Sequence, residues 1–219
     1  EITVSNGRGR DYTCSISELG RDEVLCRVED VNDNFAELPV EVTLFQGYPK
    51  SDKMDLIVQK MVELGVCRIV PVFTARTIVK LDAKKSKARF ERWASIAKSA
   101  AMQSGRSSKP VVHAPCSVAG AVDIAKDCDA VLICWEEAEL SNTLAKAVSC
   151  CIATTGKDPR SLRIALVVGP EGGLTAQEVD LFLALPYAYS ISLGPSILRT
   201  ETAGIVAPAL ALYELEVRS

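Results

Sequence analysis

From about residue 54 onward, short apolar runs alternate with segments that show helical periodicity. The apolar runs are typical of β-strands, and the absence of polar alternation within them indicates burial on both faces. Strands and helices that alternate in this way predict a parallel sheet covered by helices on both faces. The pattern therefore predicts an α/β fold for most of the 219 residues. No apolar run approaches the length that a transmembrane helix needs.

Periodicity and turn residues place the individual elements. Apolar residues from Met54 to Leu64 recur at spacings of three and four, and Gly65 marks the end of that helix. Thr175 and Glu178 have the spacing of a capping box at the start of another helix. The other helices are expected at residues 84–103, 117–126, 140–150 and 202–215, and the strands at 67–73, 111–112, 130–135, 162–168 and 189–193.

The first 46 residues differ from the rest. β-prone stretches at 12–16, 23–28 and 40–45 are separated by turn residues such as Gly20. A few strands of this size bury little apolar surface alone and need further strands or a second domain. We therefore expect a small β domain over residues 1–46 and an α/β domain over 47–219, joined by a hinge-like break at 47–51. The chain begins with Glu1 and shows no signal-peptide pattern, so we expect it to be part of a longer reading frame.

The eight cysteines show no metal-ligand spacing, since none forms a C-x-x-C pair and His113 is the only histidine. We expect no metal, and we interpret the cysteines as small buried apolar residues of a protein in the reducing cytoplasm.

Charge is distributed unevenly along the chain. Ten basic residues lie between Arg76 and Lys109 and are opposed by only Asp82 and Glu91, so this segment carries +8 while the remainder carries −11. Such asymmetry can hold a phosphate backbone even on an acidic protein. A solvated helix face explains the same pattern, and the sequence leaves both interpretations open.

Two strand ends carry the motifs that bear most on function. Strand 162–168 runs into Gly169-Pro170-Glu171-Gly172-Gly173, and strand 189–193 runs into Gly194 and then Leu198-Arg199-Thr200-Glu201-Thr202. Loops at the carboxyl ends of parallel strands can converge on one small molecule. The first loop lacks both the Walker and the dinucleotide-binding patterns.

Each loop has two possible explanations. The first can be an ordinary strand-to-helix turn, or its exposed amides and carbonyls can read the edge of an adenine. In the second, Thr200 can simply cap a helix while Glu201 complements the helix dipole. Arg199 is harder to explain structurally, because an arginine between a ligand loop and a helix start suits an anionic partner.

Taken together, the two loops resemble the 16S ribosomal RNA uracil-N3 methyltransferase family of the SPOUT superfamily. The resemblance also covers segments 53–55, 59–66, 76–77, 91–93 and 103–106, in order and at matching spacing, and spans about residues 45–215. It implies an α/β parallel sheet with a C-terminal trefoil knot, and a homodimer with each site near the partner subunit. It also implies an N-terminal PUA-like RNA-binding barrel, of which this chain lacks the first strands.

The resemblance further implies methyl transfer from S-adenosylmethionine to N3 of a uridine in 16S RNA of the small ribosomal subunit. Arg199 would stabilise negative charge on the uracil carbonyls, and either Glu201 or water would accept the N3 proton. The cofactor would contact Gly169, Pro170, Glu171, Gly172, Gly173, Leu193, Gly194, Ile197, Leu198, Thr200 and Trp135, with Glu136 as a weaker candidate. The RNA would contact Lys53, Arg76, Lys80, Arg92, Gln103 and Arg106.

Three alternatives remain at this stage. The same fold and cofactor could methylate a ribose 2′-hydroxyl or another base. The chain could be a binding module that docks RNA without catalysis and without S-adenosylmethionine. It could also be a small-molecule α/β protein whose basic helix is only solvated surface.

Overall fold

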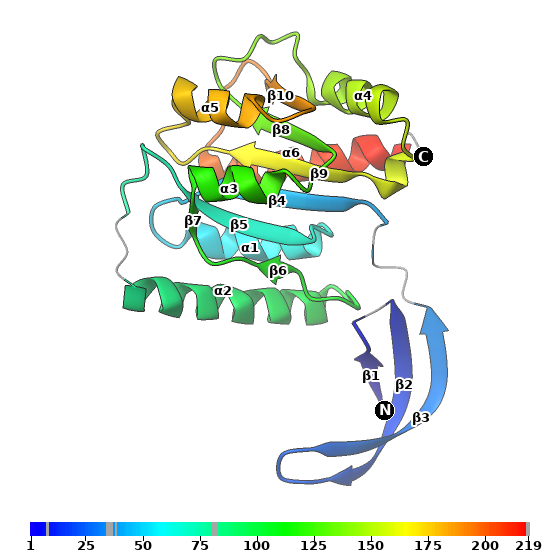
Figure 1. The fold of residues 1–219 in the computed structure, drawn as a ribbon. Coiled ribbons are helices and arrows are strands. Elements are labelled where there is room, and N and C mark those ends of the chain that lie inside the picture. The colour runs from blue at the N-terminus through cyan, green and yellow to red at the C-terminus, as the bar shows by residue number, and fades with distance from the viewer. Residues whose placement is uncertain (8, 34–36, 38, 80–82, 218–219) are drawn as a thin grey trace.

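The structure is a computed structural model that describes residues 1–7, 9–33, 37, 39–79 and 83–217. A three-stranded antiparallel sheet extends from a larger α/β body (Figure 1). The small sheet has the order β1 (Ile2–Ser5), β2 (Arg10–Leu19) and β3 (Val24–Asp33). Only Cys14 of these three strands is buried, because no second layer covers either face in the described residues.

The body is built on a seven-stranded sheet in which every pairing is parallel. The strand order is β10-β8-β9-β4-β5-β6, and the short strand β7 also pairs with β5. The strands are β4 (Glu41–Gly47), β5 (Arg68–Phe73), β6 (Val111–Val112), β7 (Cys116–Ser117), β8 (Ala130–Cys134), β9 (Arg163–Val168) and β10 (Ala188–Ile191). The α/β class that the alternating pattern predicts is confirmed.

Helices cover both faces of this sheet (Figure 1). One apolar cluster joins the sheet to α1 (Lys53–Glu63), α2 (Ala83–Gln103), α4 (Leu144–Thr155) and α6 (Thr200–Val217). A second, on the opposite face, joins it to α3 (Val118–Ala125) and α5 (Ala176–Leu183). A single 3₁₀ turn, η1 (Pro159–Ser161), precedes β9. Strand β4 shows the two-sided burial directly, since Leu44 belongs to the first cluster and Phe45 to the second.

The expected strand at 40–45 lies at the centre of the parallel sheet, between β9 and β5, rather than with the N-terminal strands. The expectation grouped it with its neighbours in sequence. Its side chains from Val42 to Phe45 are all buried, which is the property of a central parallel strand. Residues 41–47 therefore contribute to the body on which the candidate site is built.

Helix α4 also begins and ends later than expected. The Thr143 side chain accepts a hydrogen bond from the Lys146 amide and caps its start, and Gly156 ends it in the left-handed conformation. The capping box predicted from Thr175 and Glu178 is present. All eight cysteines are free, but only Cys14 and Cys151 are buried and Cys150 is exposed, so the interpretation of the cysteines as buried residues is wrong for the others. Within the described ranges, no helix combines the length and apolar character needed to span a membrane.

Candidate functional site

A cavity of about 540 Å³ lies at the carboxyl edge of the parallel sheet, where strands β8, β9 and β10 end side by side. Its walls come from the loop after β9, the loop between β10 and α6, and the residues that follow β8. The lining includes Gly169, Pro170, Glu171, Gly173, Leu193, Gly194, Ile197, Leu198, Arg199, Thr200 and Trp135. The two sequence motifs therefore form one pocket, as their positions at strand ends predicted.

Close backbone packing shapes the first loop. Gly173 adopts a φ of +71°, and a Cβ there would lie 2.9 Å from the Glu136 carboxylate. A side chain on Gly47, at the end of β4, would overlap the backbone of Pro170. The loop after β9 thus lies directly against the end of β4 and against Glu136. At Gly47 only glycine permits this approach without displacing the backbone of the loop, whereas at Gly173 a side chain would push against the end of the Glu136 side chain.

A chain of hydrogen bonds connects the two loops beneath the cavity. The Thr200 hydroxyl donates to the Gly169 carbonyl at 2.6 Å. Gln46, fully buried at the end of β4, donates from Nε2 to that hydroxyl at 2.9 Å and to the Gly47 carbonyl at 3.1 Å. Gln46 is not among the residues predicted from the sequence. Its only signal in the sequence is a polar residue near the end of a strand that is mostly apolar.

A three-residue ionic cluster lies beside the loops. The Lys53 ammonium forms ion pairs of 3.0 Å with both Glu171 and Glu201. The Glu171 carboxylate also accepts hydrogen bonds from the Lys50 amide. The cluster connects the start of α1, the loop after β9 and the first turn of α6. Lys53 was expected to bind RNA phosphate, but its charge is here shared between two carboxylates.

These contacts set the charge state of both glutamates. Burial raises the pKa of the Glu201 carboxyl, but hydrogen bonds from its own backbone amide and from Lys53 outweigh burial, so the pKa falls below its ordinary value. The pKa of Glu171 is lowered in the same way, with Lys53 opposing the effect of burial. Both groups are therefore carboxylates at neutral pH. Deeper in the cavity, burial raises the pKa of the Cys134 thiol to about 12, which keeps it neutral.

Arg199 lies at the rim of the cavity with its side chain exposed. Within the described parts of the chain, its guanidinium makes no hydrogen bond or ion pair. It follows the apolar segment that ends at Leu198 and directly precedes α6. A cation that is anchored at the backbone and unpaired at its tip can contact an anion that enters the cavity.

Arg76 and Gly172 form a support on the outer side of the first loop. Arg76 Nη1 donates to the carbonyls of Gly172 and Leu174, at 2.8 and 3.3 Å. Gly172 is absent from the cavity lining, and its Cα faces the Arg76 side chain. Gly172 and Arg76 thus support the loop from its outer side. The cofactor contact expected at Gly172 and the RNA contact expected at Arg76 stay predictions.

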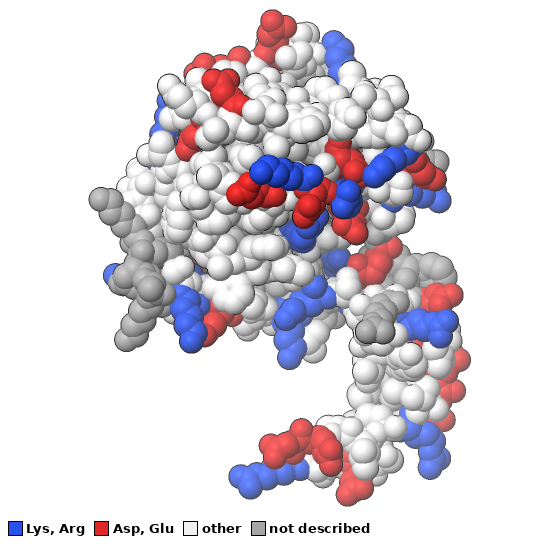
Figure 2. Space-filling model, viewed as in Figure 1, with Lys and Arg blue, Asp and Glu red and all other residues white. Residues whose placement is uncertain are grey.

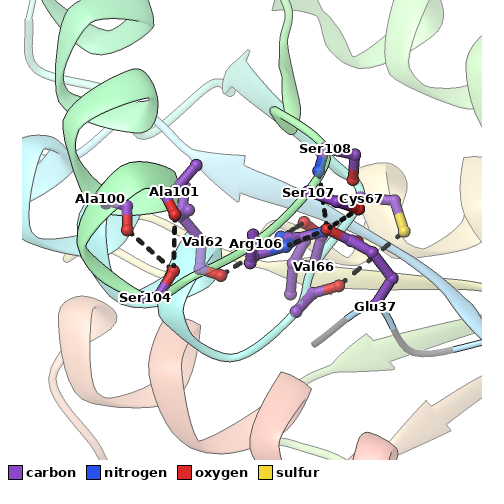
Figure 3. Close-up of polar contacts among 11 residues, drawn as sticks. Glu37, Val62, Val66, Cys67, Ala100, Ala101, Ser104, Arg106, Ser107 and Ser108 are labelled. Atoms are coloured by element: carbon purple, nitrogen blue, oxygen red, sulfur yellow. Dashed lines mark hydrogen bonds and ion pairs between the residues drawn. The ribbon is translucent and has the colours of Figure 1, made fainter. Parts of the chain in front are cut away.

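Burial argues against the phosphate contact expected at Arg106, because this arginine is only 7% exposed. Its guanidinium donates to the Val62 and Val66 carbonyls and forms an ion pair of 2.8 Å with Glu37 (Figure 3). The carboxylate also accepts from the Ser108 amide at 2.8 Å. Arg106 thus joins the end of α1 and the turn after α2 to the segment that precedes β4.

Part of the basic segment is paired within the body. Arg89 and Arg92 form ion pairs with Asp52 and Asp55. Gln103, at the end of α2, is exposed, and Lys80 lies outside the described residues. Figure 2 shows acidic and basic side chains mixed on the face that it presents, rather than gathered into one basic patch. The RNA-contact expectation for Arg92 and Gln103 stays a prediction.

The dimensions and chemistry of the cavity suit a nucleoside-sized ligand with a positive centre. Its volume lies within the usual range for small-molecule sites, roughly 300–1,000 Å³. The Trp135 indole Nε1 is buried and has no hydrogen-bond partner among the described residues, and Trp135 lines the cavity. Glu136 and Glu171 add carboxylates to the lining. In the described chain, no cluster of three histidine, cysteine or acidic side chains could hold a metal ion.

Comparison with known proteins identifies the family. A family model described as an RNA methyltransferase domain matches residues 36–212. The chain is 36% identical to ribosomal RNA small subunit methyltransferase E of Bacillus subtilis (strain 168) over 217 residues, which cover 99% of this chain and 83% of the relative. The chain belongs to the ribosomal RNA small subunit methyltransferase E family. The resemblance inferred from the two loops is confirmed.

Further members of the methyltransferase E family agree with this assignment. The chain is 30% identical over 213 residues to the protein of that name from Mycobacterium bovis, covering 94% of this chain and 76% of the relative. A crystal structure of the Neisseria gonorrhoeae methyltransferase E bound to S-adenosyl methionine superimposes with a TM-score of 0.75 at 30% identity, covering 95% of this chain and 81% of that one.

Proposed function

We propose that this protein transfers a methyl group from S-adenosylmethionine to N3 of a uridine in 16S RNA of the small ribosomal subunit. The observation that carries the proposal is the convergence of both strand-end loops on one cavity, with the unpaired Arg199 at its rim. Family membership gives the reaction class, since the relatives carry the name of small-subunit RNA methyltransferases. The substrate also places the proposed reaction in the cytoplasm.

The residues of the cavity fit the proposed cofactor. The backbone groups of Gly169 to Gly173 and of Leu193 to Leu198 would hold the adenosine, and the Trp135 side chain forms part of the cavity wall. The Glu171 and Glu136 carboxylates favour a cationic ligand. When bound, S-adenosylmethionine supplies an electrophilic methyl on a sulfonium, so that the protein's task is to place the acceptor in line with it.

Arg199 would act on the base that accepts the methyl. Loss of the N3 proton spreads negative charge onto the two flanking uracil carbonyls, and a guanidinium can donate to such oxygens. None of the described residues occupies the donors of the Arg199 guanidinium, so these donors can make this contact. We assign Arg199 the role of stabilising the developing uracil anion.

Glu201 is less suited to the role of proton acceptor than its position suggests. Its pKa is lowered and its carboxylate is paired with Lys53, so it would gain a proton only against that ion pair. We therefore propose that the Lys53–Glu171–Glu201 cluster holds the walls of the site together, and that water accepts the N3 proton.

Several finer features of the family are proposed for this chain. The segment after β10 pairs with the loop after β8, where the Ser192 amide donates to the Asn142 carbonyl, and we propose that the trefoil knot of the family lies in this region. Ile197 and Leu140 line the cavity although they are 86% and 62% exposed, and a second copy of the chain would cover them in a homodimer. Strands β1 to β3 would belong to a PUA-like domain that docks RNA.

The deciding experiment is methyl transfer from labelled S-adenosylmethionine to small subunits from a strain that lacks the modification, with the product nucleoside identified by mass spectrometry. We expect 3-methyluridine. A ribose-methylated nucleoside or another methylated base would keep the fold and cofactor but replace the acceptor. Absence of both cofactor binding and transfer, with RNA binding retained, would indicate a non-catalytic binding module.

A further inference from the structure

We infer that Gln46 is a positioning residue for the proposed methyl transfer. It holds Arg199, at the start of α6, at a fixed distance from the loop that begins at Gly169 and would bind the cofactor. The inference rests on the proposed function. Gln46 lies on β4, a strand that supplies none of the sequence motifs, and it does not line the cavity. It would therefore act through Thr200 and Gly169 rather than on substrate.

The hydrogen-bond directions around Gln46 are determined by its neighbours. The carbonyls of Gly47 and Gly169 can only accept, and the Thr200 hydroxyl uses its proton in the 2.6 Å bond to Gly169. The hydroxyl oxygen must therefore accept from Gln46 Nε2. A reversed amide would place Oε1 against these oxygens. The side-chain NH₂ is thus the part of Gln46 that the loops require.

The amide oxygen of Gln46, Oε1, carries a free-energy cost. Gln46 Oε1 is buried and accepts no hydrogen bond from any described residue. It lies against α6 at Gly204, where a Cβ would overlap it. A buried acceptor left unpaired costs about 1–3 kcal/mol. An apolar side chain would avoid that cost, so the contribution of the amide must come from the donors that it directs at the two loops.

Through these hydrogen bonds, Gln46 sets the distance between Arg199 and the loop that begins at Gly169. Gly169 begins the loop that would hold the adenosine, and Thr200 is bonded directly to Arg199 in the chain. Gln46 and Thr200 together tie the first residue of α6 to the first residue of that loop. A misplacement of about 1 Å caused by a change outside the chemistry can cost about a hundredfold in rate.

The test uses Gln46→Met, which keeps the length of the side chain and removes the donors. We expect turnover on small subunits to fall by about tenfold to a hundredfold, while the dissociation constant for S-adenosylmethionine changes less than about fivefold. Thr43→Val is the matched control. Thr43 is also buried on β4, and its hydroxyl accepts from Arg68 rather than from either loop.

Thr200 variants distinguish positioning from general destabilisation. Thr200→Ser keeps the hydroxyl and should retain most turnover, whereas Thr200→Val should lose about as much as Gln46→Met. The double variant Gln46→Met, Thr200→Val should lose little more than either single variant, because both interrupt one chain of hydrogen bonds. Full additivity in the double variant, or wild-type turnover in Gln46→Met, would overturn the inference.

Amide hydrogen exchange provides a readout that does not depend on activity. In Gln46→Met, we expect faster exchange at the amides of residues 171–174 and 201–204 and unchanged exchange elsewhere in the sheet, with Thr43→Val as the reference. Unchanged exchange at both loops would contradict the role of Gln46. If the wild-type protein transfers no methyl group, the proposed function fails, and the exchange result still decides whether Gln46 holds the loops together.

Discussion

Lys53, at the start of α1, forms an ion pair of 3.0 Å with Glu201 in the first turn of α6, and the same ammonium also binds Glu171. One cation therefore joins three segments around the cavity. Two carboxylates would otherwise face each other at this point, and the proposed site depends on their being held in place.

Replacing Lys53 with methionine should lower turnover at neutral pH by about tenfold and shift its pH dependence. The pKa of Glu201 lies below its ordinary value, so this carboxyl is ionised at neutral pH. Without the ammonium, the pKa of Glu201 should rise, and activity should begin to fall at a higher pH as the medium is acidified. Lys60→Met is the control, because Lys60 forms its ion pair with Glu63 on the same helix and does not line the cavity. If turnover of Lys53→Met falls at the same pH as that of the wild type on acidification, Lys53 does not control the ionisation of Glu201.

The same variant tests whether Lys53 contacts RNA. A lysine that neutralises one phosphate contributes about one unit to the slope of log affinity against log salt. Because the Lys53 charge is shared between two carboxylates, we expect the slope for Lys53→Met to equal that of the wild type in a filter-binding titration. A slope that is smaller by about one in Lys53→Met would support the phosphate contact predicted from sequence.

Substitution of Arg199 with alanine should leave the dissociation constant for S-adenosylmethionine within about tenfold and reduce turnover by about a hundredfold or more. Arg199 makes no hydrogen bond or ion pair with another described residue, so its removal should not change the midpoint of thermal unfolding. Arg199→Lys keeps the charge but loses the planar donor pair, and we expect it to recover only part of the rate. Near-wild-type turnover in the alanine variant would limit Arg199 to a structural role.

The buried pair between Arg106 and Glu37 should contribute to stability rather than to RNA binding. Arg106→Met removes a donor from the Val66 carbonyl, and one of the donors from both the Val62 carbonyl and the Glu37 carboxylate, which keep the amides of Gly65 and Ser108. We expect the free energy of unfolding in urea to fall by about 3 kcal/mol, near the low end for a broken buried pair because Glu37 is partly exposed. Lys98→Met, an exposed change on α2, should be close to neutral.

The pH dependence of that stability follows from the pKa of Glu37. Burial raises this pKa, but hydrogen bonds from Arg106 and from the Ser108 amide outweigh burial, so the folded pKa is below its ordinary value. The stabilisation is therefore complete above the unfolded pKa and is lost as the pH falls through the lower folded pKa. In Arg106→Met, the acid-induced loss of stability should be smaller than in the wild type. An equal loss in both would show that Glu37 does not contribute.

Gly173→Ala should impair cofactor binding, while Gly105→Ala should not. Both glycines have φ of +71°, so alanine should cost each a similar amount of stability, about 1 kcal/mol. Only at Gly173 would the new Cβ meet Glu136, since nothing lies within 4 Å of the corresponding position at Gly105. Calorimetric titration with S-adenosylmethionine should show at least tenfold weaker binding for Gly173→Ala alone. Equal affinities would mean that the loop accommodates a side chain.

Contacts between segments distant in the sequence explain where the sequence-based predictions failed. Arg106 has the residue type of a phosphate ligand, and no local pattern shows that Val62, Val66 and Glu37 surround it. In the sequence, Gln46 looks like any polar residue at a strand end. Its role follows from its contacts with α6 and with the loop after β9, which only the folded structure shows. The strand at 41–47 was grouped with its neighbours in sequence, although its pairing partners β5 and β9 come later in the chain.

Local chemistry along the chain was sufficient to establish the α/β class, the helix starts such as the Thr175 capping box, and the two loops that end at glycine. Each of these depends on side-chain periodicity or on backbone preferences over a few residues. Tertiary structure alone decided which charges are paired. The ion pairs of Lys53 and Arg106 and the hydrogen bonds of Gln46 join residues far apart in sequence, and such contacts depend on how helices pack against the sheet.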